Sequence, residues 1–484
     1  MVAQRSRRSA SRVSALAAAS SSEIPASLAS CASLTASISA GGPETGSPRL
    51  TSIKESRRRV RQLAMCAMST PAGQPPGKSL SVWASATNRR SVSRCSSSKR
   101  VISESVKEAI PSPYSADSTE PRVSSLELFF DLVFVFTITQ LTSLIARDPS
   151  ITGLFQMVLI FGNVWWMYGG YAWLTNAVPP RELGIRLLLL LGMSGFLLIA
   201  LAIPTAFGAG GVAFGVGYML VTLVHTGVFM RSSQQGVMQA VRGLGPFNLV
   251  TGVLLLGAGF SNGWLRWGLF AASFVLHWLT PYLTPIGGFR IRVGHFVERH
   301  GLILLIAIGE SVVAVGIGLG TAALPAGRII TALLGLALAA SLWWLYFNAD
   351  EERAERAMER APEERRPWLA VQAFGYIFLP ILGGIVVVAA GMKLAVVGYD
   401  ERATVATAFF LASGVAAYAF GLALFRWFLH SGPLSVRLAI AVLAVPTALV
   451  GVALTALAQV FVLVAILIAG AIVDSAVTNR HAVR

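Results

Sequence analysis

The sequence predicts an all-α fold: a polytopic transmembrane helix bundle of about twelve spans that follows a disordered N-terminal tail. Composition is the first reason, because 54% of the residues are hydrophobic and only 13% are charged, whereas a soluble domain carries about 25% charged residues. The second is a series of apolar runs after Pro121, each long enough to cross roughly 30 Å of hydrocarbon. The third is an alternation of basic residues between the connecting segments. An ordinary soluble enzyme is excluded.

The tail, residues 1–118, holds most of the excess positive charge. Residues 1–125 contain 18 Lys and Arg against 7 Asp and Glu, whereas residues 126–484 contain 21 against 16. A stretch so rich in Ser, Arg and Pro buries too little apolar surface to order itself. We interpret it as disordered and as the product of a start codon annotated too far upstream, with an organelle transit peptide as the alternative. Its cysteines, Cys31, Cys66 and Cys95, lack metal-ligand spacing.

Twelve apolar runs are expected to be the transmembrane helices. The fifth and sixth runs share the short turn Ser261-Asn262-Gly263 with Arg266 beside it, so this pair could be a tight hairpin with one short or tilted member. The predicted spans are 126–146, 151–175, 184–206, 209–230, 246–261, 263–282, 298–320, 327–348, 368–390, 403–429, 434–454 and 457–475.

Basic residues in the connecting segments predict the orientation, because short cytoplasmic segments are enriched in Lys and Arg. With the N-terminus inside, sixteen fall on the inner side and five on the outer side. The inner ones are Arg181, Arg186, Arg231, Arg242, Arg290, Arg292, Arg299, Arg353, Arg356, Arg360, Arg365, Arg366, Arg426, Arg437, Arg480 and Arg484, and the outer ones are Arg147, Arg266, Arg328, Lys393 and Arg402. This alternation predicts an even number of spans in the cell (plasma or inner) membrane, with both termini cytoplasmic. The longest inner segment, 350–367, carries alternating charges and is expected to be a solvated helix with a structural role.

An internal repeat is indicated by two motifs that recur in the same order. Glu127 opens the first span and Glu298 the seventh, and Trp pairs follow 38 and 45 residues later, at Trp165-Trp166 and Trp343-Trp344. The sequence therefore predicts a six-helix membrane repeat at 119–292 and a second at 293–478. Because six is an even number, the two copies would have parallel topology.

The same motifs resemble the bacterial low temperature requirement protein A (LtrA) family over about residues 121–475. They are LELFFDLVFVF from Leu126 with TQL from Thr139, YAWLTN from Tyr171, HFVERHGL from His295, GES from Gly309 and LWWLYF from Leu342. The resemblance implies a polytopic inner-membrane protein tied to growth in the cold, with no established substrate or reaction. The acid-bearing first helix also resembles that of the endolysosomal-type potassium channel family, but Phe130-Asp131 stands where that family has a Ser-Asp pair.

Ionisable side chains within apolar runs are the functional candidates, because inserting one costs about 2.5–3.5 kcal/mol. Glu127 and Asp131 lie four residues apart on one face of the first span. Ser124 and Glu127 also fit a capping box, in which the carboxylate would satisfy a backbone amide and do nothing else. Asp131 is one turn deeper, too far in for a cap, and is either functional or ion-paired with a neighbouring helix.

Glu310 is the leading candidate. It lies 12 residues beyond Glu298, about 18 Å along a helix and near the bilayer midplane. No basic residue flanks it in sequence, so its carboxyl group suits a proton-coupled or cation-binding site. The alternative is a protonated Glu that hydrogen-bonds to a neighbouring helix. Ser311 follows it, and Gly309 would let another helix or a substrate approach the backbone.

The segment His295-Phe296-Val297-Glu298-Arg299-His300 is expected to form a polar collar at the cytoplasmic mouth and to pair with Glu127 or Asp131 if the two copies face each other. Zinc is not expected, because the chain has no H-E-x-x-H motif and no second His-rich helix. We predict no metal and no cofactor.

His225 and His277 stand alone in apolar spans and are expected to make interhelical hydrogen bonds. The Trp pairs are interpreted as packing or interface anchors. Nucleotide-binding and hydrolase motifs are absent from the sequence, so an enzyme is disfavoured. The favoured function is a secondary transporter or proton/cation-coupled carrier with a small solute or cation as substrate; the alternatives are a cation channel and an intramembrane lipid-handling factor. The expected partner is the lipid bilayer, not nucleic acid, and one sequence does not reveal the oligomeric state.

Overall fold

The computed structural model describes residues 123–230, 235–284, 289–320 and 325–482. The predicted tail, residues 1–118, and Arg231, one of the inner basic residues, lie outside them. All regular structure in the described residues is helical. Eleven of the described helical segments are long and apolar enough to cross a membrane. The predicted all-α class with many transmembrane helices is confirmed.

The helices follow one another with short connections. In chain order they are α5 (Ser125–Arg147), α6 (Ile151–Ala177), α7 (Leu183–Ala202), η1 (Ile203–Thr205), α8 (Gly211–Phe229), α9 (Gln235–Phe260), α10 (Gly263–Leu283), α11 (Val293–Leu319), α12 (Ala326–Phe347), α13 (Asp350–Arg360), η2 (Glu363–Arg365), α14 (Arg366–Ala370), the π-helical η3 (Val371–Ile377), α15 (Phe378–Ala395), α16 (Val405–Leu429), α17 (Ser435–Ala444), α18 (Thr447–Ala453) and α19 (Ala456–Ala482).

Two prolines account for the main departures from the predicted spans. The fifth span was expected to begin at Pro246, but α9 begins eleven residues earlier and contains this proline, which membrane helices tolerate where neighbours satisfy the freed backbone groups. The eleventh span, 434–454, divides into α17 and α18 at Pro446, because proline lacks the N–H that would continue the helical hydrogen bonds.

The α9–α10 hairpin contains the tight turn expected around Asn262. Gly263 has a φ of +55°, a left-handed conformation that glycine adopts without strain. Arg266 is buried, and its guanidinium donates hydrogen bonds to the carbonyl oxygens of Ala258, Ser261 and Gly208. It therefore caps the end of α9. α10 does not count among the eleven segments that are apolar enough to span a membrane.

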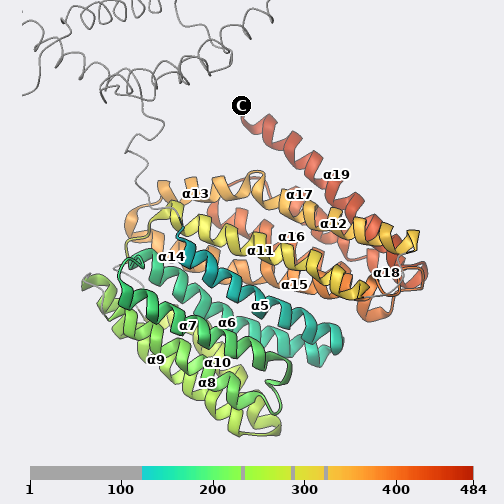
Figure 1. Ribbon diagram of the computed structural model, residues 1–484. Helices are drawn as coiled ribbons and strands as arrows, with labels where there is room; N and C mark the ends of the chain where they lie inside the picture. Colours follow the sequence, from blue (N-terminus) through green and yellow to red (C-terminus); the bar gives the residue numbers. More distant parts are fainter. Residues whose placement is uncertain (1–122, 231–234, 285–288, 321–324, 483–484) are drawn as a thin grey trace, which may run out of the picture. The chain divides into compact units, whose positions relative to one another are not determined.

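The helices fall into two groups, α5–α10 and α11–α19, drawn in teal to green and in yellow to red in Figure 1. In the first, α5 contacts α6 and α7, α7 contacts α8, α8 contacts α9, and α6 contacts α10. In the second, α11 contacts α12 and α15, α15 contacts α16, α16 contacts α17, and α12 contacts α19. The groups meet where α5 and α6 pack against α11 and α15.

Reciprocal glycine contacts hold α7 against α8 and α15 against α16. A Cβ atom on Gly195 would lie 3.0 Å from the carbonyl oxygen of Gly217, and one on Gly217 would lie 2.9 Å from that of Gly195. In the other pair, a Cβ on Gly384 would lie 2.7 Å from the Gly414 oxygen, and one on Gly414 would lie 2.8 Å from the Gly384 oxygen. Close backbone approach through small residues is how helices pack in lipid.

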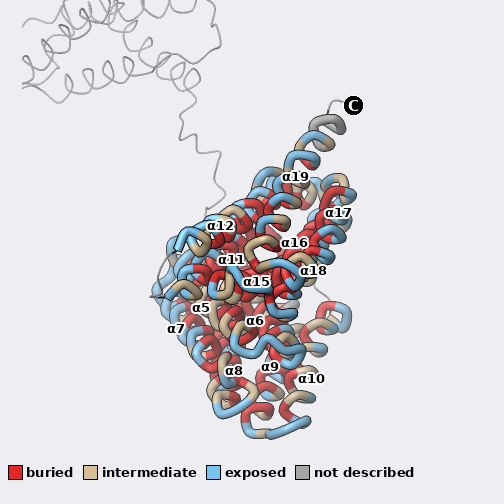
Figure 2. The backbone as a smooth tube through the Cα atoms, turned by 90° about the vertical axis from the view of Figure 1, so that its right-hand side faces the viewer, coloured by how far each residue is buried: buried red, intermediate tan, exposed pale blue. Residues whose placement is uncertain are grey.

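Apolar side chains cover the outside of the bundle while charged ones are buried inside it. Leu132, Val442 and Leu449 are 60%, 70% and 72% exposed, and Figure 2 shows exposed residues on the outer helix faces and buried ones where helices meet. This distribution is expected where hydrocarbon replaces water as the solvent.

The charged segment after α12 forms α13, as predicted, but it is not solvated throughout. Asp350, Ala354 and Met358 have no exposed surface. The expectation of a purely solvated helix is therefore wrong along one face. This face packs against the bundle, where Asp350 forms ion pairs with the buried Arg426 and Arg437.

Candidate functional site: buried charges along α5 and α11

Four buried side chains, here named the α5/α11 cluster, join the first helices of the two groups: Glu127 and Asp131 on α5, His295 and Arg299 on α11. Arg299 Nη1 lies 3.2 Å from Glu127 Oε1, and Arg299 Nη2 lies 3.1 Å from Asp131 Oδ1. His295 Nε2 lies 3.1 Å from the same Glu127 oxygen. The pairing expected of the polar collar is therefore present.

Glu127 has two roles. Its Oε2 accepts hydrogen bonds from the backbone N and the Oγ of Ser124, at 2.9 and 2.7 Å, which completes the predicted capping box. Its Oε1 faces the cations of α11. The idea that this carboxylate only caps the helix is wrong, since a carboxylate has lone pairs enough for both tasks.

The orientation of the His295 ring is set by its neighbours on two helices. The Asn176 Oδ1 of α6 accepts the backbone N–H of Arg292 at 3.1 Å, which fixes the orientation of the amide. The Asn176 Nδ2 then lies 3.2 Å from His295 Nδ1. The other ring nitrogen, Nε2, faces the Glu127 carboxylate.

Arg299 is held on several sides. Its guanidinium carbon lies 5.3 Å from the centroid of the Phe130 ring, and Nη1 also donates to Thr175 Oγ1. The Tyr168 hydroxyl donates to Asp131 Oδ1 at 2.9 Å. The Asp131 Oδ2 and the Arg299 Nε remain without hydrogen-bond partners. The cluster is therefore rigidly placed but incompletely satisfied.

The α5/α11 cluster carries unequal charge. With both carboxylates ionised, Glu127 and Asp131 face one permanently charged guanidinium and one imidazole, so balance requires a proton on the cluster or another cation. Buried charge without a counterion is costly. Uptake of a proton or a small cation is the chemistry that would balance this site.

The other two candidates of the collar lie elsewhere. Glu298 is exposed. The His300 ring is buried, and its Nδ1 lies 2.8 Å from the carbonyl oxygen of Phe296, one turn before it. His300 also packs edge-on against the rings of Trp165 and Phe378, at 6.2 and 5.6 Å. It therefore sits in an aromatic environment beside the cluster.

A second polar level lies further along the same two helices. Glu310 is 3% exposed, and its Oε2 accepts a hydrogen bond from Thr139 Oγ1 of α5 at 2.7 Å. Lys393 of α15 attracts it electrostatically and donates to Ser143 Oγ at 3.2 Å. The interhelical hydrogen bond was one of the two roles expected for Glu310. The basic neighbour comes from a distant part of the chain.

Apolar side chains separate the two polar levels. Contacts join Glu127 with Arg299 and Thr139 with Glu310, so α5 and α11 run side by side in the same direction. Arg299 and Glu310 are about 16 Å apart along the axis. The side chains packed between the levels are 0% exposed; they are Phe134, Ile138, Ile303, Leu304 and Ala307. The buried Thr137 of α5 also lies between the levels, and its hydroxyl has no hydrogen-bond partner.

The residues next to Glu310 are sparsely contacted. Ser311 is 3% exposed and its hydroxyl has no hydrogen-bond partner. A Cβ atom on Gly309 would meet no atom within 4 Å, so no packing partner of this glycine belongs to the described residues.

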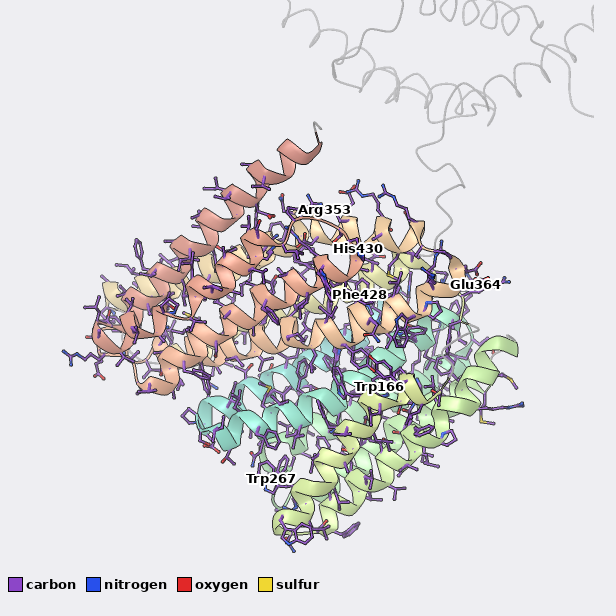
Figure 3. All side chains as sticks on the ribbon, turned by 180° about the vertical axis from the view of Figure 1, so that it is seen from behind. Trp166, Trp267, Arg353, Glu364, Phe428 and His430 are labelled. Atoms are coloured by element: carbon purple, nitrogen blue, oxygen red, sulfur yellow. The ribbon has the colours of Figure 1, made fainter. Side chains whose placement is uncertain are left out.

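The two Trp pairs differ in environment. Trp165 is 2% exposed and donates its indole N–H to the carbonyl of Gly375 at 2.8 Å. Trp166, labelled in Figure 3, donates to Asn248 Oδ1 at 3.2 Å. Trp343 and Trp344 are 39% and 47% exposed on α12. The first pair packs inside the bundle, whereas the second lies at its surface.

A second buried group, here named the α16/α19 cluster, was not predicted from the sequence; its members are Asp350, Arg426, Arg437 and Asp474. Arg426 lies 2.7 Å from Asp350 and 2.8 Å from Asp474. Arg437 lies 3.4 Å from Asp350 and 3.2 Å from Asp474. Among these four buried side chains, two acids face two guanidiniums. Arg353 of α13, which is 16% exposed, adds a third guanidinium 3.8 Å from Asp350. The only usable signal was an acid, Asp474, near the end of an otherwise apolar run.

The isolated histidines have different outcomes. His277 Nε2 lies 2.5 Å from the hydroxyl of Tyr218, which is the interhelical hydrogen bond expected of it. His225 is 7% exposed and its imidazole faces the backbone of Gly170 on α6, as expected of an interhelical contact, although neither ring nitrogen reaches full hydrogen-bond geometry. Among the described side chains, no three His, Cys, Asp or Glu residues are grouped to hold a metal ion.

Comparisons with known proteins extend over most of the bundle. The family model of the bacterial low temperature requirement A protein (LtrA) matches residues 122–472. An uncharacterized protein of Rhizobium meliloti (strain 1021) is 27% identical over 289 residues, which cover 57% of this chain and 70% of that protein. No solved structure matches.

Proposed function

This chain belongs to the bacterial low temperature requirement A protein (LtrA) family, and from that premise we propose that it is a secondary transporter, a proton- or cation-coupled carrier. Its many apolar helices and its family make it an integral membrane protein in contact with the lipid bilayer. The proposal assigns Glu310 and the α5/α11 cluster to the binding of the coupling ion, with a small solute or a cation as the substrate.

One observation carries the proposal: buried carboxyl groups lie at two levels of the parallel pair α5 and α11, and a packed apolar layer separates them. Buried carboxyl groups at membrane depth suit the binding and release of protons or cations. A continuous channel would need a polar or hydrated path, whereas a closed layer between two sites is what a carrier needs to expose one site at a time.

We further propose that the bundle is a duplicated six-helix unit, 119–292 and 293–478. The helix contacts of α5–α10 recur in the same order in the second group once α17 and α18 are counted as one helix. The glycine pairs support the same equivalence, because Gly195 with Gly217 joins the third and fourth helices of one copy as Gly384 with Gly414 does in the other. Parallel copies are also consistent with the common direction of α5 and α11.

We place both termini in the cytoplasm. Three of the basic residues assigned to inner segments are buried in the two charge clusters: Arg299, Arg426 and Arg437 are 1%, 0% and 2% exposed. They do not contribute to a solvated inner surface. The remaining inner residues, with the arginines of α13 foremost, still outnumber the outer ones and support this orientation.

The test is the flux of protons and monovalent cations into liposomes that contain the full chain, with and without a pH gradient. Wild type is compared with Glu310→Gln, which keeps the shape of the side chain but cannot ionise. The matched control is Glu298→Gln, the same change at an exposed position of the same helix. We expect gradient-dependent flux in wild type and in the control, and its loss in Glu310→Gln.

Each other outcome rejects part of the proposal. Undiminished flux in Glu310→Gln would remove Glu310 from the site. A cation current that neither saturates nor depends on the gradient would replace the carrier with a channel. Absence of flux in correctly inserted wild-type protein would reject ion coupling and favour lipid handling or an uncharged substrate.

A further inference from the structure

A cavity of about 90 Å³ lies among α6, α8, α9, α10 and the π-helical η3. Neither Glu310 nor any member of the two charge clusters lines it. Its walls are mostly aromatic rings, contributed by Trp165, Trp166, Trp173, Phe229, Trp278 and Phe289.

Two polar groups on the wall are incompletely satisfied. The His225 imidazole is 7% exposed and faces the backbone of Gly170, but neither its Nδ1 nor its Nε2 reaches hydrogen-bond geometry. The buried Nε1–H of Trp278 has no hydrogen-bond partner among the described residues. A buried polar group without a partner is costly, so native structures usually satisfy it with a neighbour, a water or a ligand. Here both groups belong to the wall of one cavity.

The composition of the wall limits the chemistry of an occupant. No carboxylate, lysine or arginine is among the lining residues, so a charged molecule would find no counterion there. The aromatic walls favour stacking or edge contacts with another ring. The indole N–H of Trp278 requires an acceptor, and a neutral imidazole offers one donor and one acceptor.

The size of the cavity suits a small molecule. It measures about 90 Å³, the same order of magnitude as the roughly 150 Å³ of an apolar protein cavity that accommodates benzene. The backbone of η3 forms part of the wall at Val371 and Gly375. Single π-helical turns often occur at functional sites.

We propose that this cavity binds a neutral compound with a single aromatic ring and one hydroxyl or carbonyl oxygen, the chemical class of the phenols. The ring lies against the tryptophans, and the oxygen bonds to Trp278 Nε1 and the His225 imidazole. This binding goes beyond the carrier function and does not depend on ion coupling.

Equilibrium dialysis of radiolabelled phenol and toluene against the full chain in lipid nanodiscs tests the proposal, with empty nanodiscs subtracted. Gly169→Leu fills the cavity, because a Cβ at this lining position meets no atom within 4 Å. Gly227→Leu is the matched control, since its Cβ is equally unobstructed and Gly227 does not line the cavity. His225→Phe removes the imidazole but keeps a ring.

We expect saturable phenol binding in wild type and Gly227→Leu, and its loss in Gly169→Leu. His225→Phe should weaken phenol binding about three- to tenfold, the effect of one hydrogen bond, and leave toluene unchanged. Phenol binding that does not saturate, or that Gly169→Leu leaves intact, would overturn the site. Equal affinity for toluene and phenol in wild type would overturn the role of the polar groups. Tighter binding of benzylammonium than of phenol would overturn the preference for a neutral ligand.

Discussion

The α5/α11 cluster and the α16/α19 cluster bury similar groups in different balance. The first joins the two helix groups and sets two carboxylates against one guanidinium and the imidazole of His295. The second lies within the second group and sets two carboxylates against two buried guanidiniums. Asp474 faces both of these arginines, and Asp350 faces them and the partly exposed Arg353. The Asp131 Oδ2, in contrast, has no hydrogen-bond partner.

The contrast separates a structural ion network from a site that can change its charge. Breaking a balanced buried network is strongly destabilising, because it leaves a charge without compensation. A cluster with an excess negative charge gains when that charge is neutralised. We infer that the α16/α19 cluster fixes the second group of helices, while the α5/α11 cluster takes part in ion coupling.

The largest expected effect comes from breaking the balanced cluster. Asp350→Asn would leave Arg426 and Arg437 with a single carboxylate, and we expect a loss of about 3–5 kcal/mol in the free energy of unfolding. SDS-induced unfolding in mixed micelles measures it. Asp148→Asn, at an exposed carboxylate, is the control and should change stability by less than about 0.5 kcal/mol. A loss no larger than that of the control would contradict a structural role.

In the α5/α11 cluster, replacing an acid should cost less free energy of unfolding than replacing the arginine. Asp131→Asn keeps an oxygen that accepts from Tyr168 and Arg299, removes one negative charge, and should cost at most about 1.5 kcal/mol. Arg299→Gln removes the only cation among the four side chains of the cluster and should cost about 3–5 kcal/mol. The same unfolding assay decides: equal losses for the two variants would refute the unequal balance of charge.

The two glycine pairs allow a direct test of the duplication. Gly195→Ala and Gly384→Ala each force a Cβ against a backbone oxygen and should destabilise the bundle by about 1–3 kcal/mol. Gly383→Ala is the control, because its Cβ would lie 3.8 Å from the nearest atom. Thermal unfolding in detergent gives the comparison, and a large effect at only one of the two pairs would speak against equivalent packing.

The smallest expected difference concerns the Trp pairs. Trp165→Phe loses the hydrogen bond to the Gly375 carbonyl and should cost about 1 kcal/mol. Trp344→Phe, at the exposed pair, should stay within about 0.5 kcal/mol of wild type. A thermal shift series reports both, and the reverse order would show that the surface pair is anchored by something outside this chain.

Local pattern predicted most of the fold. The apolar runs located the transmembrane helices because span length is set by the thickness of the bilayer. The capping box at Ser124 and Glu127 was readable because both partners lie within one turn. Boundaries failed at Pro246 and Pro446, where tertiary neighbours decide whether a proline is tolerated inside a helix or ends it.

The candidate site was only half predictable. Glu310 and the pairing of Arg299 with the acids of α5 could be inferred from isolated charges in apolar runs. The partners Thr139 and Lys393, and the fourfold contact of Asp350 and Asp474 with two arginines, join residues far apart in the chain. Arg426 and Arg437 were counted as loop charges, because residue type alone does not reveal whether a helix end is buried.

Arg266 bears on how the chain enters the bilayer during synthesis. Its charge is tolerated because carbonyl groups near the end of α9 and at Gly208, before α8, accept its hydrogen bonds. We infer that α10, which does not count among the eleven candidate membrane spans and carries Arg266, inserts with α9 as one helical hairpin. Glycosylation mapping of truncated nascent chains tests this, and insertion of α10 without α9 would disprove it. The two helices would then enter the membrane together. The carbonyl groups of the earlier segments accept the hydrogen bonds of Arg266, which lipid cannot accept.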